Sequence, residues 1–326
     1  MRRFLLKLGL LVGINVAIAF AIMKAVDYRR SFEQWETDSI LYVIPKNATF
    51  DFISLGTSRA RVFSEFKSNH DFVVRELRLK FLNLAIPFGG GILPEKMFLK
   101  YFFDRGNQTQ AIVLFLDPFM LFSDGSNKYH RFVYYEPFRF RFLIQLATNG
   151  IPVQRIITYV RSKFGYYWFT RGPVVKESDP RVVERKETDE EMRRRRMDTL
   201  YPDGLDEATF LRYAREVDRI FEMAQRRHAR MIVAFAPTLL GPEPGAPRVQ
   251  AFLAEAKNRY PFEVYDFTNV LDDYGLFADH DHLNSRGFRY FVRQYLEPIL
   301  TGPPPARETQ QVAALAPAEP LVDSGP

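Results

Sequence analysis

Short apolar runs alternate with helical patterns along most of the chain. The runs with the length and content of buried strands are residues 49–55, 80–86, 111–116, 231–236 and 262–267. Apolar side chains recur at helical spacing after residue 207 and again before residue 300, where Asn284 or Ser285 can cap the last helix. Strands that alternate with helices are typical of parallel sheets buried on both faces. The pattern predicts a doubly wound, flavodoxin-like α/β fold with three layers and about five parallel strands.

The N-terminus carries an apolar segment of a different kind. Residues 8–23 contain no charged side chain, and residues 4–6 extend the apolar stretch. Its length is about one bilayer crossing, and the basic residues that precede it favour a cytoplasmic N-terminus. We therefore predict that residues 1–30 form a cytoplasmic tip and an uncleaved single-pass anchor in the inner membrane, with an extracytoplasmic domain beyond. A signal peptide cleaved near residues 17–19 and a buried helix of a soluble protein are the alternatives.

The remaining chain divides into an α/β domain over residues 31–301 and a Pro- and Ala-rich tail over residues 302–326, which we expect to be disordered. An insertion over residues 118–205 exceeds what a minimal doubly wound sheet needs, so we expect it to cap one sheet edge. Residues 128–142 of this insertion interleave aromatic side chains with arginine. This pattern is typical of a surface for sugars, anionic polymers or membranes, or of a packed subdomain. The four arginines at 193–196 follow acidic residues and predict a charged helix face.

Composition narrows the possible functions. The chain has 326 residues, of which 47% are hydrophobic and 26% charged, as in globular proteins and unlike disordered or fibrous ones. Its net charge of +6 is too small to predict nucleic-acid binding. Because the chain has no cysteine, disulfides, thiolate metal sites and a cysteine nucleophile are excluded.

A first candidate for chemistry follows the first predicted strand, which ends in Gly56, Thr57 and Ser58. In open α/β sheets, sites form where strands end and helices begin. A serine at such a helix N-terminus can act as a nucleophile, and its own N–H can help to hold an oxyanion. The alternative is a serine that merely caps the helix or forms the turn.

A second candidate precedes the last helix, in the stretch from Asp279 to Asn284. Serine needs a base that takes its proton, and the base works best when a carboxylate fixes its tautomer. Asp279 and His282 fit that pairing. Two alternatives remain, a metal site formed by both histidines and both aspartates of this stretch, and a plain helix-capping loop.

These motifs together resemble those of the SGNH (GDSL-like) hydrolase superfamily, over about residues 50–300. The resemblance rests on Gly56-Thr57-Ser58, on residues 83–89 after the second strand, and on Asp279-x-x-His282-Leu-Asn-x-x-Gly287. It is strongest to the membrane-anchored branch that O-acylates cell-envelope and exopolysaccharides, often beside a multi-spanning membrane-bound O-acyltransferase.

The resemblance implies roles for individual residues. Ser58 corresponds to the nucleophile, His282 to the general base and Asp279 to its orienting partner. Gly89, with Gly90 beside it, corresponds to the glycine whose N–H contributes to the oxyanion hole. The implied mechanism requires no metal and no organic cofactor.

Two positions depart from the family pattern: Thr57 stands where the first family motif usually has an aspartate, and the other position lies in the third motif. The third family motif usually ends in an asparagine that donates to the oxyanion, whereas this chain has Asp117 there. An ionised carboxylate offers no donor and repels an oxyanion. Asp117 could instead bind Arg59 or Arg61 as a structural partner.

We therefore predict an anchored serine acyltransferase or esterase that acts on O-acyl groups, expected to be acetyl, of an extracytoplasmic polysaccharide. Its expected partners are a glycan acceptor, the membrane and a multi-spanning acyltransferase, but no nucleic acid. Two other classes stay open, a catalytically weak carbohydrate-binding or assembly protein and a small-ester hydrolase.

Overall fold

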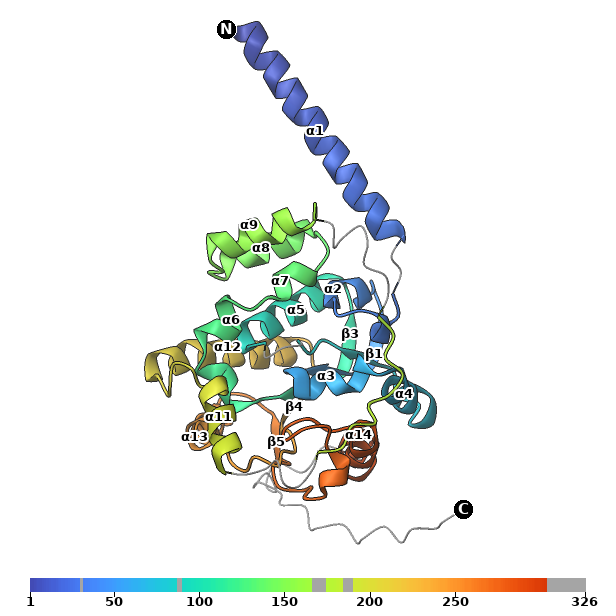
Figure 1. Ribbon diagram of the computed structural model, residues 1–326, viewed down its shortest axis with the longest axis vertical. Helices are drawn as coiled ribbons and strands as arrows, with labels where there is room; N and C mark the ends of the chain where they lie inside the picture. The colour runs from blue at the N-terminus through green and yellow to red at the C-terminus, as the bar shows by residue number, and fades with distance from the viewer. Residues whose placement is uncertain (30–31, 87–89, 166–173, 184–189, 304–326) are drawn as a thin grey trace.

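The computed structural model describes residues 1–29, 32–86, 90–165, 174–183 and 190–303 (Figure 1). Five parallel strands form one sheet in the order β2-β1-β3-β4-β5. Their bounds are β1 Thr49–Leu55, β2 Phe81–Asn83, β3 Gln108–Phe115, β4 Arg230–Phe235 and β5 Glu263–Asp266. This is the strand order of flavodoxin-like doubly wound proteins, and the predicted fold class is confirmed.

Helices cover both faces of the sheet. One layer contains α2 (Ile40–Val43), α5 (Ile92–Asp104), α12 (Glu207–Arg226) and α13 (Ala246–Ala256). The opposite layer contains α3 (Ser58–Glu65), α4 (Lys67–Asp71) followed by a π-helical turn (Phe72–Glu76), α14 (Ser285–Phe291) and α15 (Glu297–Thr301). Because side chains alternate along a strand, Ile112 and Leu114 of β3 pack into the first layer and Val113 and Phe115 into the second.

The last helix continues from Ser285 to Thr301 but contains a π-helical turn at Val292–Leu296. Pro298 has no N–H to donate to the preceding turn, which accounts for the irregularity at that point. Asn284 caps the start of the helix, since its side-chain oxygen accepts a hydrogen bond from the Gly287 N–H at 2.9 Å.

The insertion consists of short helices and extended segments. Its helical elements are the 3-10 turn η3 (Pro118–Leu121), α6 (Asp124–Lys128), α7 (Phe132–Tyr135), α8 (Phe140–Thr148), α9 (Val153–Ser162) and α11 (Glu190–Leu200). Residues 174–183, which we call the strap, run extended across the second layer. Strap carbonyls accept hydrogen bonds from the N–H groups of Lys67 and Ser68. Two further 3-10 turns, Gln34–Glu36 and Tyr274–Leu276, lie outside the insertion.

The N-terminal helix α1 (Arg2–Arg29) projects from the domain (Figure 1). Its apolar stretch, Arg2–Asp27, is long enough to cross a membrane and is exposed rather than buried against the domain. It is therefore not a core helix of this domain, and it has the length and composition of a single anchor or a signal sequence. The domain boundaries stay predictions, and most of the predicted tail lies outside the described residues.

The turn after β1 depends on a glycine. Gly56 has φ of 143°, a region that favours glycine, and an added Cβ would lie 2.9 Å from the Cβ atoms of Ala60 and Phe115. Both neighbours belong to packed elements, α3 and β3, so neither can move without disturbing the core. Gly56 thus permits the close approach of α3 to the sheet.

We predict that Gly56→Ala lowers the free energy of unfolding by about 2 to 4 kcal/mol, because backbone strain and overpacking add. Gly150→Ala is the matched control, since Gly150 has φ of 69° but no atom within 4 Å of an added Cβ, and it should cost about 1 kcal/mol. Urea unfolding of both variants in detergent measures the difference. Equal losses of unfolding free energy in the two variants would show that the close contacts around Gly56 add nothing to the cost of the substitution.

Candidate active site

Ser58 is the first residue of α3, which begins just after the end of β1. Thr57 is the N-cap, and its Oγ1 accepts a hydrogen bond from the Arg59 N–H at 3.4 Å. As the first residue of the helix, Ser58 has an N–H without an intrahelical partner, in the positive end of the helix dipole. The serine hydroxyl therefore sits where a developing negative charge would be stabilised.

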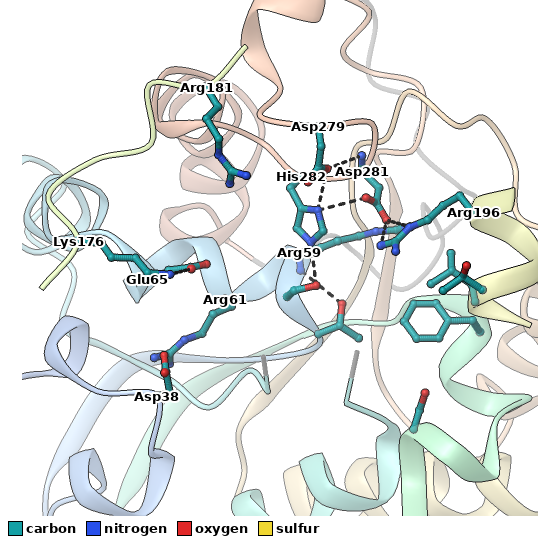
Figure 2. Close-up of a pocket in the computed structure, with 16 residues that line it drawn as sticks. Asp38, Arg59, Arg61, Glu65, Lys176, Arg181, Arg196, Asp279, Asp281 and His282 are labelled. Carbon is teal, nitrogen blue, oxygen red and sulfur yellow. Dashed lines mark hydrogen bonds and ion pairs between the residues drawn. The ribbon is translucent and has the colours of Figure 1, made fainter. Parts of the chain in front are cut away.

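The structure brings Ser58, His282 and Asp279 together, and Figure 2 shows the His282 ring beside Asp279. His282 Nε2 lies 2.8 Å from Ser58 Oγ, and His282 Nδ1 lies 2.8 Å from Asp279 Oδ1. Both distances are within hydrogen-bond range, although Ser58 and His282 are 224 positions apart in the chain. The two hydrogen bonds connect the serine hydroxyl, the imidazole ring and the carboxylate in the geometry that serine activation needs.

The loop that carries His282 is held by its backbone. The His282 carbonyl accepts a hydrogen bond from the Ala278 N–H, and the His280 carbonyl accepts one from the Leu239 N–H, both at 2.8 Å. Phe277 and Leu283 form an antiparallel bridge at the base of the loop. The imidazole is thus positioned by a closed loop fixed at both ends.

Asp281 is a second carboxylate beside the imidazole. Its Oδ1 lies 3.1 Å from His282 Nδ1, and its Oδ2 accepts hydrogen bonds from Arg196 at 2.6 and 3.0 Å and from Arg59 at 3.3 Å (Figure 2). The sequence had suggested Asp281 only as a metal ligand and Arg196 only as part of a charged helix face. Arg196 lies on the helix α11, but its guanidinium pairs with a buried carboxylate outside that helix, which the local charge pattern does not predict.

These carboxylates control the charge of the imidazole. Burial by itself would lower the pKa of His282, but hydrogen bonds and negative charges of Asp279 and Asp281 raise it to about 9. Burial would likewise raise the pKa of Asp281, but the hydrogen bond with His282 and the positive charge of Arg59 hold it well below its usual range. At neutral pH the protonated imidazole predominates, and the neutral form that can accept a proton increases with pH.

Asp117 binds Arg59, one of the two roles considered for it. Arg59 donates to Asp117 at 2.9 Å and to Glu243 at 2.8 Å, while the Thr57 hydroxyl also donates to Asp117. Arg61 does not contact Asp117 but donates to the Thr37 carbonyl. Asp117 is 1% exposed and lies outside the cavity that contains Ser58. Its carboxylate is thus paired beneath the N-terminus of α3.

The two glycines predicted to hold an oxyanion are not seen in that role. Gly89 lies outside the described residues. Gly90 is buried, with an added Cβ only 2.5 Å from the Ile86 side chain, and it does not line the cavity at Ser58. Of the two predicted oxyanion-donor residues that the structure describes, Ser58 lines the cavity and Gly90 does not.

A cavity of about 530 Å³ opens over Ser58. The insertion supplies much of its wall, from η3 and α6, from the strap and from α11. Figure 2 shows Lys176 and Arg181 of the strap and Arg196 of α11 around this cavity. The lining residues are mostly charged or polar: Asp38, Thr57, Ser58, Arg59, Arg61, Glu65, Phe119, Ser126, Lys176, Arg181, Arg196, Thr199, Leu200, Asp279, Asp281 and His282. These side chains offer many hydrogen-bond and charge partners to a ligand rich in hydroxyl groups or charges.

A metal ion bound by Asp279, Asp281 and His282 would have to displace existing ion pairs. Ligand atoms of Asp279, Asp281 and His282 lie within 4.8 Å of one another. However, Asp281 already pairs with Arg59 and Arg196, so a cation there would compete with two guanidinium groups. The arrangement favours proton transfer over metal binding.

Comparisons with known proteins add little to this geometry. No family model matches the chain, and no curated protein matches its sequence. Sixteen chains of solved structures match, among them a protein from Bacteroides fragilis described as a candidate acylhydrolase. That match covers 79% of this chain and 92% of the other, with 10% identity and a TM-score of 0.36. Similarity at this level does not assign a family or an activity.

We predict that Asp281→Asn lowers the pKa of His282 from about 9 toward the ordinary histidine value, because one of two adjacent negative charges is lost. Histidine-selective NMR titration measures it directly, since the chain has five histidines and His282→Asn identifies the signal. Asp266→Asn, a substitution on β5 outside the cavity, is the control. An unchanged pKa in Asp281→Asn would contradict the assignment of Asp281 as a charge partner.

The free energy of unfolding should also depend on pH through the titration of His282. The pKa of His282 is higher in the folded protein than the value of about 6.5 expected in the unfolded chain. The stabilisation of the folded protein by the protonated His282 imidazole is therefore fully present below about pH 6.5, and it is lost as the pH rises through about 9. His282→Asn should remove this part of the pH dependence of unfolding.

Proposed function

We propose that this protein is a membrane-anchored serine acyltransferase or esterase that acts on O-acetyl groups of an extracytoplasmic polysaccharide. The observation that carries the proposal is the hydrogen-bonded series from Ser58 Oγ through the His282 ring to Asp279. In this proposal Ser58 is the nucleophile, His282 the general base and Asp279 the group that orients the imidazole.

The first half of the reaction forms an acyl-enzyme. Ser58 Oγ attacks the acyl carbonyl carbon of a donor ester while His282 Nε2 takes the hydroxyl proton. The carbonyl oxygen becomes an oxyanion near the Ser58 N–H at the positive end of α3. When the tetrahedral intermediate collapses, the bond to the leaving oxygen breaks and His282 gives its proton to that oxygen.

The second half releases the acyl group. A hydroxyl group of the acceptor loses its proton to His282 Nε2 and attacks the acyl carbon, and Ser58 recovers the proton as its ester bond breaks. A sugar hydroxyl gives transfer and water gives hydrolysis. Support for a sugar acceptor comes from the many polar and charged side chains that line the cavity beside the apolar side chains of Phe119 and Leu200.

The proposed location follows from α1. As an anchor with a cytoplasmic N-terminus, α1 would hold the domain at the outer face of the inner membrane. A multi-spanning membrane-bound O-acyltransferase is the proposed source of acyl groups, because such a partner would deliver them at the membrane surface.

We predict that wild-type protein incubated with an activated acetyl ester forms an acetyl adduct on Ser58. Ser58→Ala should abolish the adduct because the nucleophile is lost, and His282→Ala should reduce its rate by at least about 100-fold because the base is lost. Intact-mass measurement with peptide mapping detects the adduct. Ser126→Ala is the matched control, since Ser126 lines the same cavity but does not contact His282 in the described structure.

Absence of an adduct in correctly folded protein would contradict the enzyme proposal. Polysaccharide binding that survives Ser58→Ala would then support a carbohydrate-binding or assembly protein. If an adduct forms but passes only to water and never to an oligosaccharide, the protein is an esterase.

We also predict that the rate of acyl-enzyme formation rises with pH up to about 9, because only the neutral imidazole accepts the Ser58 proton. In Asp281→Asn the rise should occur at lower pH. A pH profile of single-turnover acylation tests this, and identical profiles for the two proteins would contradict it.

A further inference from the structure

The helices α8 and α9 of the insertion are apolar on two sides. Their inner sides pack on the domain through buried Phe142 and Leu146 of α8 and Tyr159 of α9. Their outer sides carry Phe140 and Ile144 on α8, which are four positions apart and therefore share a face. A surface helix of a soluble domain normally turns polar residues outward.

The outer side of α9 also carries apolar side chains. Val153 is 68% exposed and Ile157, four positions later on the same face, is 52% exposed, and Phe164 in the turn just beyond the helix is 50% exposed. We call the exposed residues Phe140, Ile144, Val153, Ile157 and Phe164 the α8–α9 face. The described residues beyond α1 include thirteen exposed large apolar side chains, and seven of them lie between Tyr129 and Phe164. This concentration marks an interaction surface.

The position of this surface is tied to α1. Asp27, near the end of α1, forms an ion pair with Arg139, the residue immediately before α8. The Tyr42 hydroxyl also donates to Asp27 at 3.2 Å. In Figure 1, α8 and α9 form the end of the domain nearest to α1, on the side away from α14. A bilayer crossed by α1 would therefore begin beside these two helices.

The charge of this region fits a membrane surface. Residues 128–164 contain seven lysines or arginines and one acidic residue, Glu136, a net charge of +6 that equals the net charge of the whole chain. Arg131, Arg141 and Arg161 are exposed there, as are the amphipathic side chains of Tyr129 and Tyr134. Basic and aromatic residues around an apolar stripe are typical of helices that lie in the headgroup region of anionic bilayers.

We propose that the α8–α9 face lies in the headgroup region of the membrane that α1 crosses, as a second contact between this protein and the bilayer. The inference rests on the part of the proposed function that keeps α1 in the membrane, and it does not depend on acyl chemistry. The occupant is the lipid surface, with anionic headgroups facing the arginines and acyl chains reaching the apolar side chains.

The experiment uses the full chain in vesicles of phosphatidylethanolamine and phosphatidylglycerol. Because the chain has no cysteine, single nitroxide labels can be attached at Phe140→Cys and Ile157→Cys without background. Leu211→Cys on α12 is the matched control, an exposed leucine (44%) on a helix distant from α1 in Figure 1. Power-saturation electron paramagnetic resonance measures how often each nitroxide label collides with oxygen, which concentrates in lipid, and how often it collides with a water-soluble nickel complex.

Labels at 140 and 157 should show a high ratio of oxygen to nickel collisions, and the label at 211 the reverse. Ile144→Glu combined with Val153→Glu should return the label at 157 to a water-like ratio, since both positions are exposed and the changes spare the core. Nickel accessibility at 140 and 157 equal to that at 211 would overturn the proposal. Spin–spin broadening that increases with protein density would also overturn it, because a second copy would then cover the face.

Failure here is distinguishable from failure of the proposed function. The accessibility of the labels is measured without substrate or turnover. A water-exposed α8–α9 face would leave an acetyl adduct on Ser58 unaffected, and a missing adduct would leave the accessibility measurement unaffected.

Discussion

The buried guanidinium of Arg59 is the contact on which the site depends. It pairs with Asp117 after β3, Glu243 between β4 and α13, and Asp281 before α14. A buried charge without partners costs several kcal/mol, so the docking of α3 requires carboxylates from these segments beside Arg59. Because Arg59 immediately follows Ser58, this requirement fixes the serine relative to the ends of two strands and to the loop that carries His282.

The same ion cluster extends into the insertion. Arg196 of α11 shares the Asp281 carboxylate with Arg59, and Asp281 in turn contacts His282. The electrostatic environment of the imidazole therefore includes a residue from a segment that a minimal doubly wound sheet lacks. A shift of α11 that moves Arg196 away from Asp281 would change the electrostatic environment of the imidazole without moving Ser58.

The sequence predicted the sheet and the Ser58, His282 and Asp279 cluster because parallel strands end at one edge, where their following loops must converge. It could not predict the partners of long charged side chains. Arg195 pairs with Glu191 four residues earlier, as the local pattern indicates, whereas Arg196 is rotated about 100° around the helix and meets Asp281. Asp117 had two plausible arginine partners, and spacing alone does not decide between them.

The strap shows that the insertion is not a detachable module. Its carbonyls accept the N–H groups of Lys67 and Ser68 at the start of α4, and Asp179 exchanges hydrogen bonds with Ser285 at the start of α14. Backbone donors at helix starts need partners from outside the helix. An ancestor or an engineered minimal domain without residues 118–205 would have to cap both helices in another way, so the length of this loop is part of the domain's architecture.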